Sequence, residues 1–340
     1  MSIEKERAFE NFLNEQRDEA WASTLAKLLP SIHEVDRTAT SIWFAFYPVS
    51  LWRALRESAD ADGLMKRLLM QGDFYLKDQI DSSHTFFYGH RYWPEVKRSL
   101  AEHAANFMNA PGAELEGQIE MVARDAAKRV RADESLLVGI TAVAFMTALQ
   151  AGFNAFKASP GTVQIDRKHA KKSPEQILSE RAKDDSQGLF GFLKTVDKEW
   201  TVTYDENEDG ARFKSISGEE LASAAARDRS RDWRTVDARC VEGPIPVECR
   251  AASCGTCWVG ILGGAEKLSP VGRLEGRRIK EFGYINTEEP KPIIRLACMA
   301  QASGAVSIVI PPWNAQFGKH LGEKNGGAGE EETAHQEVAN

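Results

Sequence analysis

The sequence predicts an α+β protein in which an all-helical N-terminal domain precedes a C-terminal domain built on a mixed sheet. Apolar residues recur at helical spacing through the first 158 residues, whereas alternation typical of strands begins only at Trp200. A chain of 340 residues also has room for about two domains. We therefore expect a helical domain over 1–158, a linker over 159–195, a sheet domain over 196–320 and a disordered tail over 321–340, which is rich in Gly and Glu.

The N-terminal domain is expected to be a bundle of about six helices without strands. The first helical run carries apolar residues from Phe9 to Leu29 and stops at Pro30. The later predicted helices are Ile42–Leu55 with a break at Pro48, Leu64–Leu76, Pro94–Met108 with its proline at the first position, Glu114–Ala132, and Leu136–Phe156.

The segment Leu136–Ala155 contains no charged residue and has about the length that a bilayer requires. Contact with a membrane is therefore one interpretation. Thr141, Thr147 and Gln150 interrupt its apolar surface, and this favours a central bundle helix that is apolar all round because other helices surround it.

The predicted linker contains three features. The basic run Arg167–Lys172 is interpreted as a solvated face, with the docking of an acidic partner as the alternative. Ser173 and Pro174 predict the start of a helix, as N-cap and first residue. An apolar patch, Leu189–Leu193, is expected to pack the linker onto one of the domains.

The C-terminal domain is expected to contain a hairpin of strands Trp200–Tyr204 and Ala211–Ile216, followed by a short helix, Leu221–Ala226. A strand at Cys257–Leu262 and a closing strand at Ala305–Ile310 complete the prediction. Together these elements predict a mixed sheet that grips a helix.

Four of the five cysteines form a recognisable set. A C-x4-C-x2-C segment is followed by forty residues and a last cysteine, so the four are Cys249, Cys254, Cys257 and Cys298. This spacing is typical of a [2Fe–2S] cluster held by four thiolates. Between them, Gly255 allows the backbone to approach closely, and Ser253 and Thr256 can donate further hydrogen bonds. We expect Cys240 to be a small buried residue and not a ligand.

Other uses of the cysteines fit less well. A zinc ribbon normally has two C-x2-C pairs, and this chain has one. The charged N-terminus lacks the apolar stretch of a secretory signal, which favours metal ligands over disulfides and predicts a cytoplasmic location. The Cys-Pro pair typical of [4Fe–4S] sites is absent, because Met299 follows Cys298.

These residues resemble the plant-type [2Fe–2S] ferredoxin family. The matching motifs are Ile245-Pro246 before Cys249, the Ser-Cys-Gly-Thr-Cys run at 253–257, Arg295-Leu-Ala-Cys298 and the closing run 306–311. The resemblance covers roughly Trp200 to Pro312 and implies a β-grasp fold that performs one-electron transfer. It implies no catalytic residue in this domain.

The chain departs from the family in two basic enlargements. One lies between Cys257 and Cys298 and includes Arg273, Arg277, Arg278, Lys280, Phe282 and Tyr284. The other precedes Cys249 and includes Arg227, Arg229, Arg231, Trp233 and Arg234. We expect them to give the domain a partner surface of its own.

The leading functional prediction is an electron carrier whose helical domain docks redox partner proteins, a reductase and an acceptor. The alternatives are a redox enzyme or oxygenase component whose helical domain binds a substrate or second cofactor, and a cluster-based redox sensor. His84 and His90 flank an aromatic run, and we expect them to be interior or docking residues before metal ligands. The sheet domain is nearly neutral, which argues against nucleic acid, and the sequence has no Gly-x-Gly-x-x-Gly or P-loop for a nucleotide.

Overall fold

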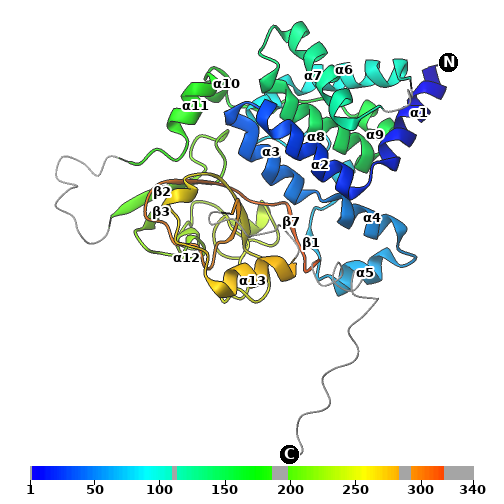
Figure 1. The fold of residues 1–340 in the computed structure, drawn as a ribbon. Helices are drawn as coiled ribbons and strands as arrows, with labels where there is room; N and C mark the ends of the chain where they lie inside the picture. The colour runs from blue at the N-terminus through cyan, green and yellow to red at the C-terminus, as the bar shows by residue number, and fades with distance from the viewer. Residues whose placement is uncertain (1, 109–112, 186–197, 283–291, 318–340) are drawn as a thin grey trace, which may run out of the picture.

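The computed structural model describes residues 2–108, 113–185, 198–282 and 292–317. Figure 1 shows helices α1–α9 gathered on one side and the main sheet with α12 and α13 on the other. The helices of the first group are α1 (Ser2–Glu15), α2 (Asp18–Leu28), α3 (Glu34–Phe46), α4 (Val49–Glu57), α5 (Ala61–Arg67), α6 (Trp93–Asn106), α7 (Leu115–Val130), α8 (Ser135–Ala151) and α9 (Phe153–Ala158). Short 3-10 turns lie at Leu29–Ser31, Leu76–Asp78 and Tyr88–Tyr92.

Helix α8 is the centre of the helical part. Every residue from Leu136 to Leu149 is buried, and α1, α3, α6 and α7 all pack against this helix. The uniformly apolar surface is thus explained by neighbours on all sides. Among the described residues, no helix is both long enough and apolar enough to cross a bilayer.

The predicted breaks mark real helix ends. Pro48 separates α3 from α4, and Pro94 lies in the first turn of α6. The predicted single helix Leu136–Phe156 is wrong at one point, because Gly152 takes a left-handed φ of 86° and ends α8 before α9 begins.

The predicted helix Leu64–Leu76 is wrong. Helix α5 ends at Arg67, and Gln71–Gly72 then forms a short strand, β1. This strand pairs with β7 (Trp313–Asn314) near the other end of the chain. The expectation of an N-terminal part without strands is therefore also wrong, because a distant partner supplies the hydrogen bonds that local periodicity cannot reveal.

Two short helices connect the helical part to the sheet. Helix α10 (Arg167–Ala170) is capped by Asp166, and α11 (Pro174–Glu180) begins with the predicted Ser173 cap. Ser173 and Gln176 form a reciprocal capping box. The apolar patch Leu189–Leu193 and the tail 321–340 lie outside the described residues.

The main sheet is mixed and has five strands in the order β3-β2-β6-β4-β5. The strands are β2 (Glu199–Thr203), β3 (Arg212–Ile216), β4 (Trp258–Gly263), β5 (Ile294–Leu296) and β6 (Val306–Val309). Only the central β2–β6 pair is parallel. The predicted hairpin and closing strand are confirmed, and the helices here are α12 (Leu221–Ala225) and α13 (Arg273–Phe282).

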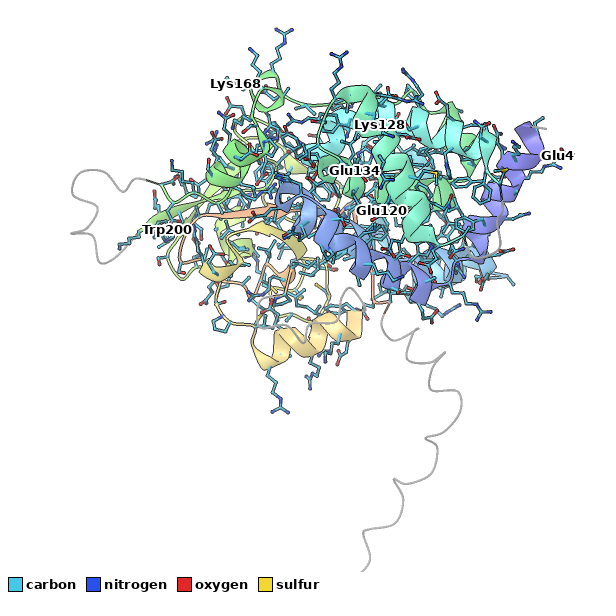
Figure 2. The ribbon with its side chains drawn as sticks, turned by 45° about the horizontal axis from the view of Figure 1, so that its top comes forward. Glu4, Glu120, Lys128, Glu134, Lys168 and Trp200 are labelled. Carbon is cyan, nitrogen blue, oxygen red and sulfur yellow. The ribbon has the colours of Figure 1, made fainter. Side chains whose placement is uncertain are left out.

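The helical part and the sheet share a packed boundary, where α3 lies against β4. The Phe46 ring of α3 contacts Trp258 of β4 with ring centroids 5.1 Å apart. Trp313 donates its Nε1 hydrogen to the Phe46 carbonyl at 2.6 Å. At another point, Arg181 binds Glu206 and the Val35 carbonyl at 3.0 Å. In Figure 2, Glu4 on α1 and Trp200 on β2 lie at opposite sides of the molecule, with this boundary between them.

Candidate metal centre

The cysteine set is brought together by strand pairing. Cys257 lies just before β4, and Cys298 lies just after β5. Because β4 and β5 are antiparallel, with Trp258 opposite Leu296, both cysteines lie at the same end of the pair. The Ala297 N–H also donates to the Cys257 carbonyl at 2.9 Å, which ties the two segments directly.

The four thiols interact as two pairs. The Cys254 thiol donates to Cys249, and the Cys257 thiol donates to Cys298. The pairs also act on each other, since the charge of Cys249 raises the pKa of Cys298 and the charge of Cys254 raises the pKa of Cys257. All five cysteines are free of disulfides.

Backbone N–H groups of the loop point at the sulfurs. Ala251 and Ser253 donate to Cys249 Sγ at 3.4 and 3.3 Å. The Ala252 N–H is directed at Cys298. Donors arranged in this way stabilise negative charge on sulfur.

The pKa values follow this geometry. Burial raises the pKa of Cys249, but the hydrogen bonds from Ser253, Ala251 and Cys254 outweigh it and lower the pKa to about 6. The hydrogen bond from Cys257 lowers the pKa of Cys298 and raises that of Cys257. Burial raises the pKa of Cys254. One thiol of each pair is therefore poised to lose its proton first.

The loop holds an unusual backbone. Arg250 and Ala252 have left-handed φ values of 52° and 54°, and Gly255 has 72°. Left-handed residues at alternating positions are typical of loops whose N–H groups line a concave anion site. The two non-glycine positions carry a strain that is common at functional sites. The sequence indicated this only at Gly255.

The predicted supporting residues lie where they can act on the thiols. Ser253 contributes its hydroxyl and its N–H to Cys249. Thr256 is hydrogen-bonded to Cys254 and also donates to Glu248 Oε2 at 3.1 Å. Gly255 lies under the ring of Phe282, where a Cβ atom would come within 2.8 Å of the ring.

Cys240 is separate from this set. It is buried and its thiol donates to the Pro244 carbonyl at 3.3 Å. Burial raises its pKa to about 12, with Asp237 acting in the same direction. None of the other cysteines contributes to this shift, whereas the four thiols of the set shift one another's pKa values.

Among the described residues, no group of three or more His, Cys, Asp or Glu side chains is placed to hold a metal ion. The chemistry of the donor set fits a two-iron cluster, which needs two thiolates at each iron, because the four thiols form two pairs. The groups that could hold it are Cys249, Cys254, Cys257 and Cys298.

The basic enlargements are partly neutralised. Arg227 pairs with Glu219, and Arg231 with Glu208. Arg278 and Arg277 pair with Glu281 on α13. Arg229, Arg234, Arg273 and Lys280 are exposed, Trp233 is buried, and Tyr284 lies outside the described residues.

A second polar group lies in the helical part and was not predicted as a cluster. His84 and His90 are both fully buried, and their Nδ1 atoms lie 2.9 Å apart. His90 Nε2 accepts the Gln164 N–H, so its proton lies on Nδ1 and is donated to His84. Asp81 and Lys97 lie nearby, 3.5 Å from each other. The Phe87 N–H donates to the His84 carbonyl and the His90 N–H donates to the Phe87 carbonyl, so two successive tight turns bring the rings together despite their six-residue spacing.

Comparisons with known proteins identified no relative. No protein-family model, no curated protein and no solved structure matches the chain.

Proposed function

We propose that this protein is a one-electron carrier that uses a [2Fe–2S] cluster bound by Cys249, Cys254, Cys257 and Cys298. The observation that carries the proposal is the pairing of four thiols beneath inward-pointing N–H groups. In a plant-type site of this kind the bound cluster supplies a one-electron couple at about −400 mV. A redox partner protein would deliver the electron.

The chain's own residues set the environment of that couple. Ala251, Ser253 and Ala252 direct N–H groups at two sulfurs, which favours the more negative, reduced state. Phe282 covers Gly255 and keeps water from that side of the loop. We also propose that the sheet part is a β-grasp domain, since α12 packs against β3 of a mixed sheet. Its core is continuous with that of the helical part.

A direct chemical test is anaerobic reconstitution with iron and sulfide. The expected product contains about two irons and two sulfides per chain and gives a rhombic EPR signal only after reduction. A protein that takes up one zinc or one iron, without sulfide, would overturn the proposal.

A further inference from the structure

A large cavity lies at the boundary of the helical part and the sheet. Its volume is about 610 Å³, within the range of small-molecule sites. The ends of α3 and α8, helices α1 and α4, and the segment 74–77 supply most of its lining. The rest of the lining is Phe153, at the start of α9, and Trp313, from β7 of the two-stranded sheet.

The cavity has an aromatic interior and a charged rim. Its aromatic walls are Phe46, Tyr47, Trp52, Phe74, Tyr75, Phe153 and Trp313. Arg56 lies 5.0 Å from the Trp52 ring centroid, and Lys77 lies 5.0 Å from that of Tyr75. Both cations belong to the lining and are exposed.

The walls are held by hydrogen bonds that do not need a ligand. Trp52 donates to the Gln150 carbonyl at 3.1 Å. Gln150 in turn donates to the Tyr47 carbonyl at 2.9 Å. The cavity is thus preformed, and a ring that enters it meets fixed aromatic faces.

Two tryptophans connect this cavity to the thiols. Trp258 follows the ligand Cys257 directly in the chain. Its ring centroid lies 5.2 Å from that of Trp313, and its Nε1 donates to the Trp313 carbonyl at 2.9 Å. Trp313 is itself a wall of the cavity. A continuous path of packed and hydrogen-bonded groups therefore runs from Cys257 to the cavity.

We propose that this cavity binds a quinone and that the reduced cluster passes electrons to it one at a time through Trp258 and Trp313. The inference rests on the proposed function. A cluster held by the four cysteines would supply one electron in each transfer, and the quinone would gain that electron. Two transfers, with two protons from water, convert the quinone to its quinol, and the partner reductase supplies both electrons.

The chemistry of the cavity selects this class of acceptor. A flat ring stacks on the aromatic walls. The carbonyl oxygens of a quinone become negative when an electron arrives. The lining carries two cations, Arg56 and Lys77, against one acid, Glu10, so its net charge attracts those oxygens. A protein acceptor would instead need an exposed face well beyond the size of this cavity.

Binding is tested without any redox step. Full-length, oxidised protein is titrated with 2-methyl-1,4-naphthoquinone by calorimetry. Ala151→Phe places a ring in the cavity from its rim, and we expect it to weaken binding at least about tenfold. Ala170→Phe adds the same ring at an exposed helix position outside the cavity and should leave the affinity unchanged.

Transfer is tested by stopped flow with dithionite-reduced protein. The rate of reoxidation should reach a plateau as the naphthoquinone concentration rises. Naphthalene should compete for the cavity without oxidising the cluster. Trp258→Leu should lower the saturated rate about tenfold while the binding constant stays the same. Trp258→Phe retains an aromatic ring, so its saturated rate should lie between the rates of wild type and Trp258→Leu.

Three results would overturn the inference. They are no binding of the naphthoquinone, equal affinity of Ala151→Phe and wild type, or a reoxidation rate that rises linearly with quinone concentration and is unchanged in Ala151→Phe. Linear reoxidation would mean collision at the exposed loop. If the cluster fails to assemble, the proposed function fails, yet the titration still decides whether the cavity takes a quinone.

Discussion

The cysteine loop and the histidine cluster gather ionisable groups in opposite ways. In the loop, Cys249 and Cys254 are partly exposed, and hydrogen bonds stabilise the charged thiolate of Cys249. In the helical part, His84 and His90 are fully buried, and desolvation keeps both rings neutral. The loop therefore stabilises negative charge on sulfur, whereas the histidine cluster disfavours protonation of its rings. The contrast supports the proposal that the loop holds the cluster, whereas the histidine cluster supports the fold.

The largest predicted effect lies beside the loop. Glu275 of α13 accepts two hydrogen bonds from Arg295, at 2.8 and 2.9 Å, and one from the Leu296 N–H. The two side chains are only 1% and 3% exposed. Glu275→Leu leaves Arg295 buried without its carboxylate, so we expect a loss of about 3–5 kcal/mol in the free energy of unfolding.

Urea unfolding measures this loss. Glu281→Gln, on the same helix, removes the charged partner of Arg277 and Arg278, which are both more exposed than Arg295. It should lower the free energy of unfolding by less than about 1 kcal/mol. Equal effects of the two substitutions would mean that the buried pair does not hold α13 against the ligand segment.

The second prediction concerns pH and the histidine cluster. Burial lowers the pKa of His90 to about 4, and burial together with His90 and Lys97 lowers the pKa of His84. Between pH 6.5 and 4 the unfolded chain binds protons that the folded chain refuses, so stability falls as the pH falls. The loss from His90 alone is about 3 kcal/mol across that window.

The double variant His84→Gln/His90→Gln should remove this slope. Asp36, whose pKa burial raises to about 6, acts in the opposite direction and is present in both proteins, so the difference between them isolates the histidines. Unfolding curves at pH 6.5, 5.5 and 4.5 measure it. A variant with the wild-type slope would show that the cluster does not exclude protons.

The third and smallest prediction concerns Gly255. Gly255→Ala places a Cβ atom 2.8 Å from the Phe282 ring at a φ of 72°, and we expect a loss of about 1–3 kcal/mol. Gly117→Ala lies in helix α7 with open space around it and should be neutral or stabilising by about 0.5–1 kcal/mol. Thermal unfolding compares them. A harmless Gly255→Ala would contradict the close packing of α13 on the loop.

The sequence predicted the cysteine set because its ligands follow a short spacing and a pair of adjacent strands. It predicted the helix boundaries at Pro48 and Pro94 for the same local reason, but it did not predict the end of α8 at Gly152. It did not predict β1, because the partner strand lies more than two hundred residues away, nor the contact between His84 and His90, because a turn creates it. The sequence did not predict the cavity either, because Trp313 reaches it only after the whole chain has folded.

The most direct test of the central claim compares two cysteine variants after anaerobic reconstitution. Cys298→Ser removes a proposed ligand, whereas Cys240→Ser removes a buried thiol outside the set. We predict that Cys240→Ser assembles about two irons and two sulfides per chain, as wild type does, and that Cys298→Ser loses the cluster or its wild-type EPR spectrum. Equal cluster content and identical spectra in the two variants would contradict the assignment.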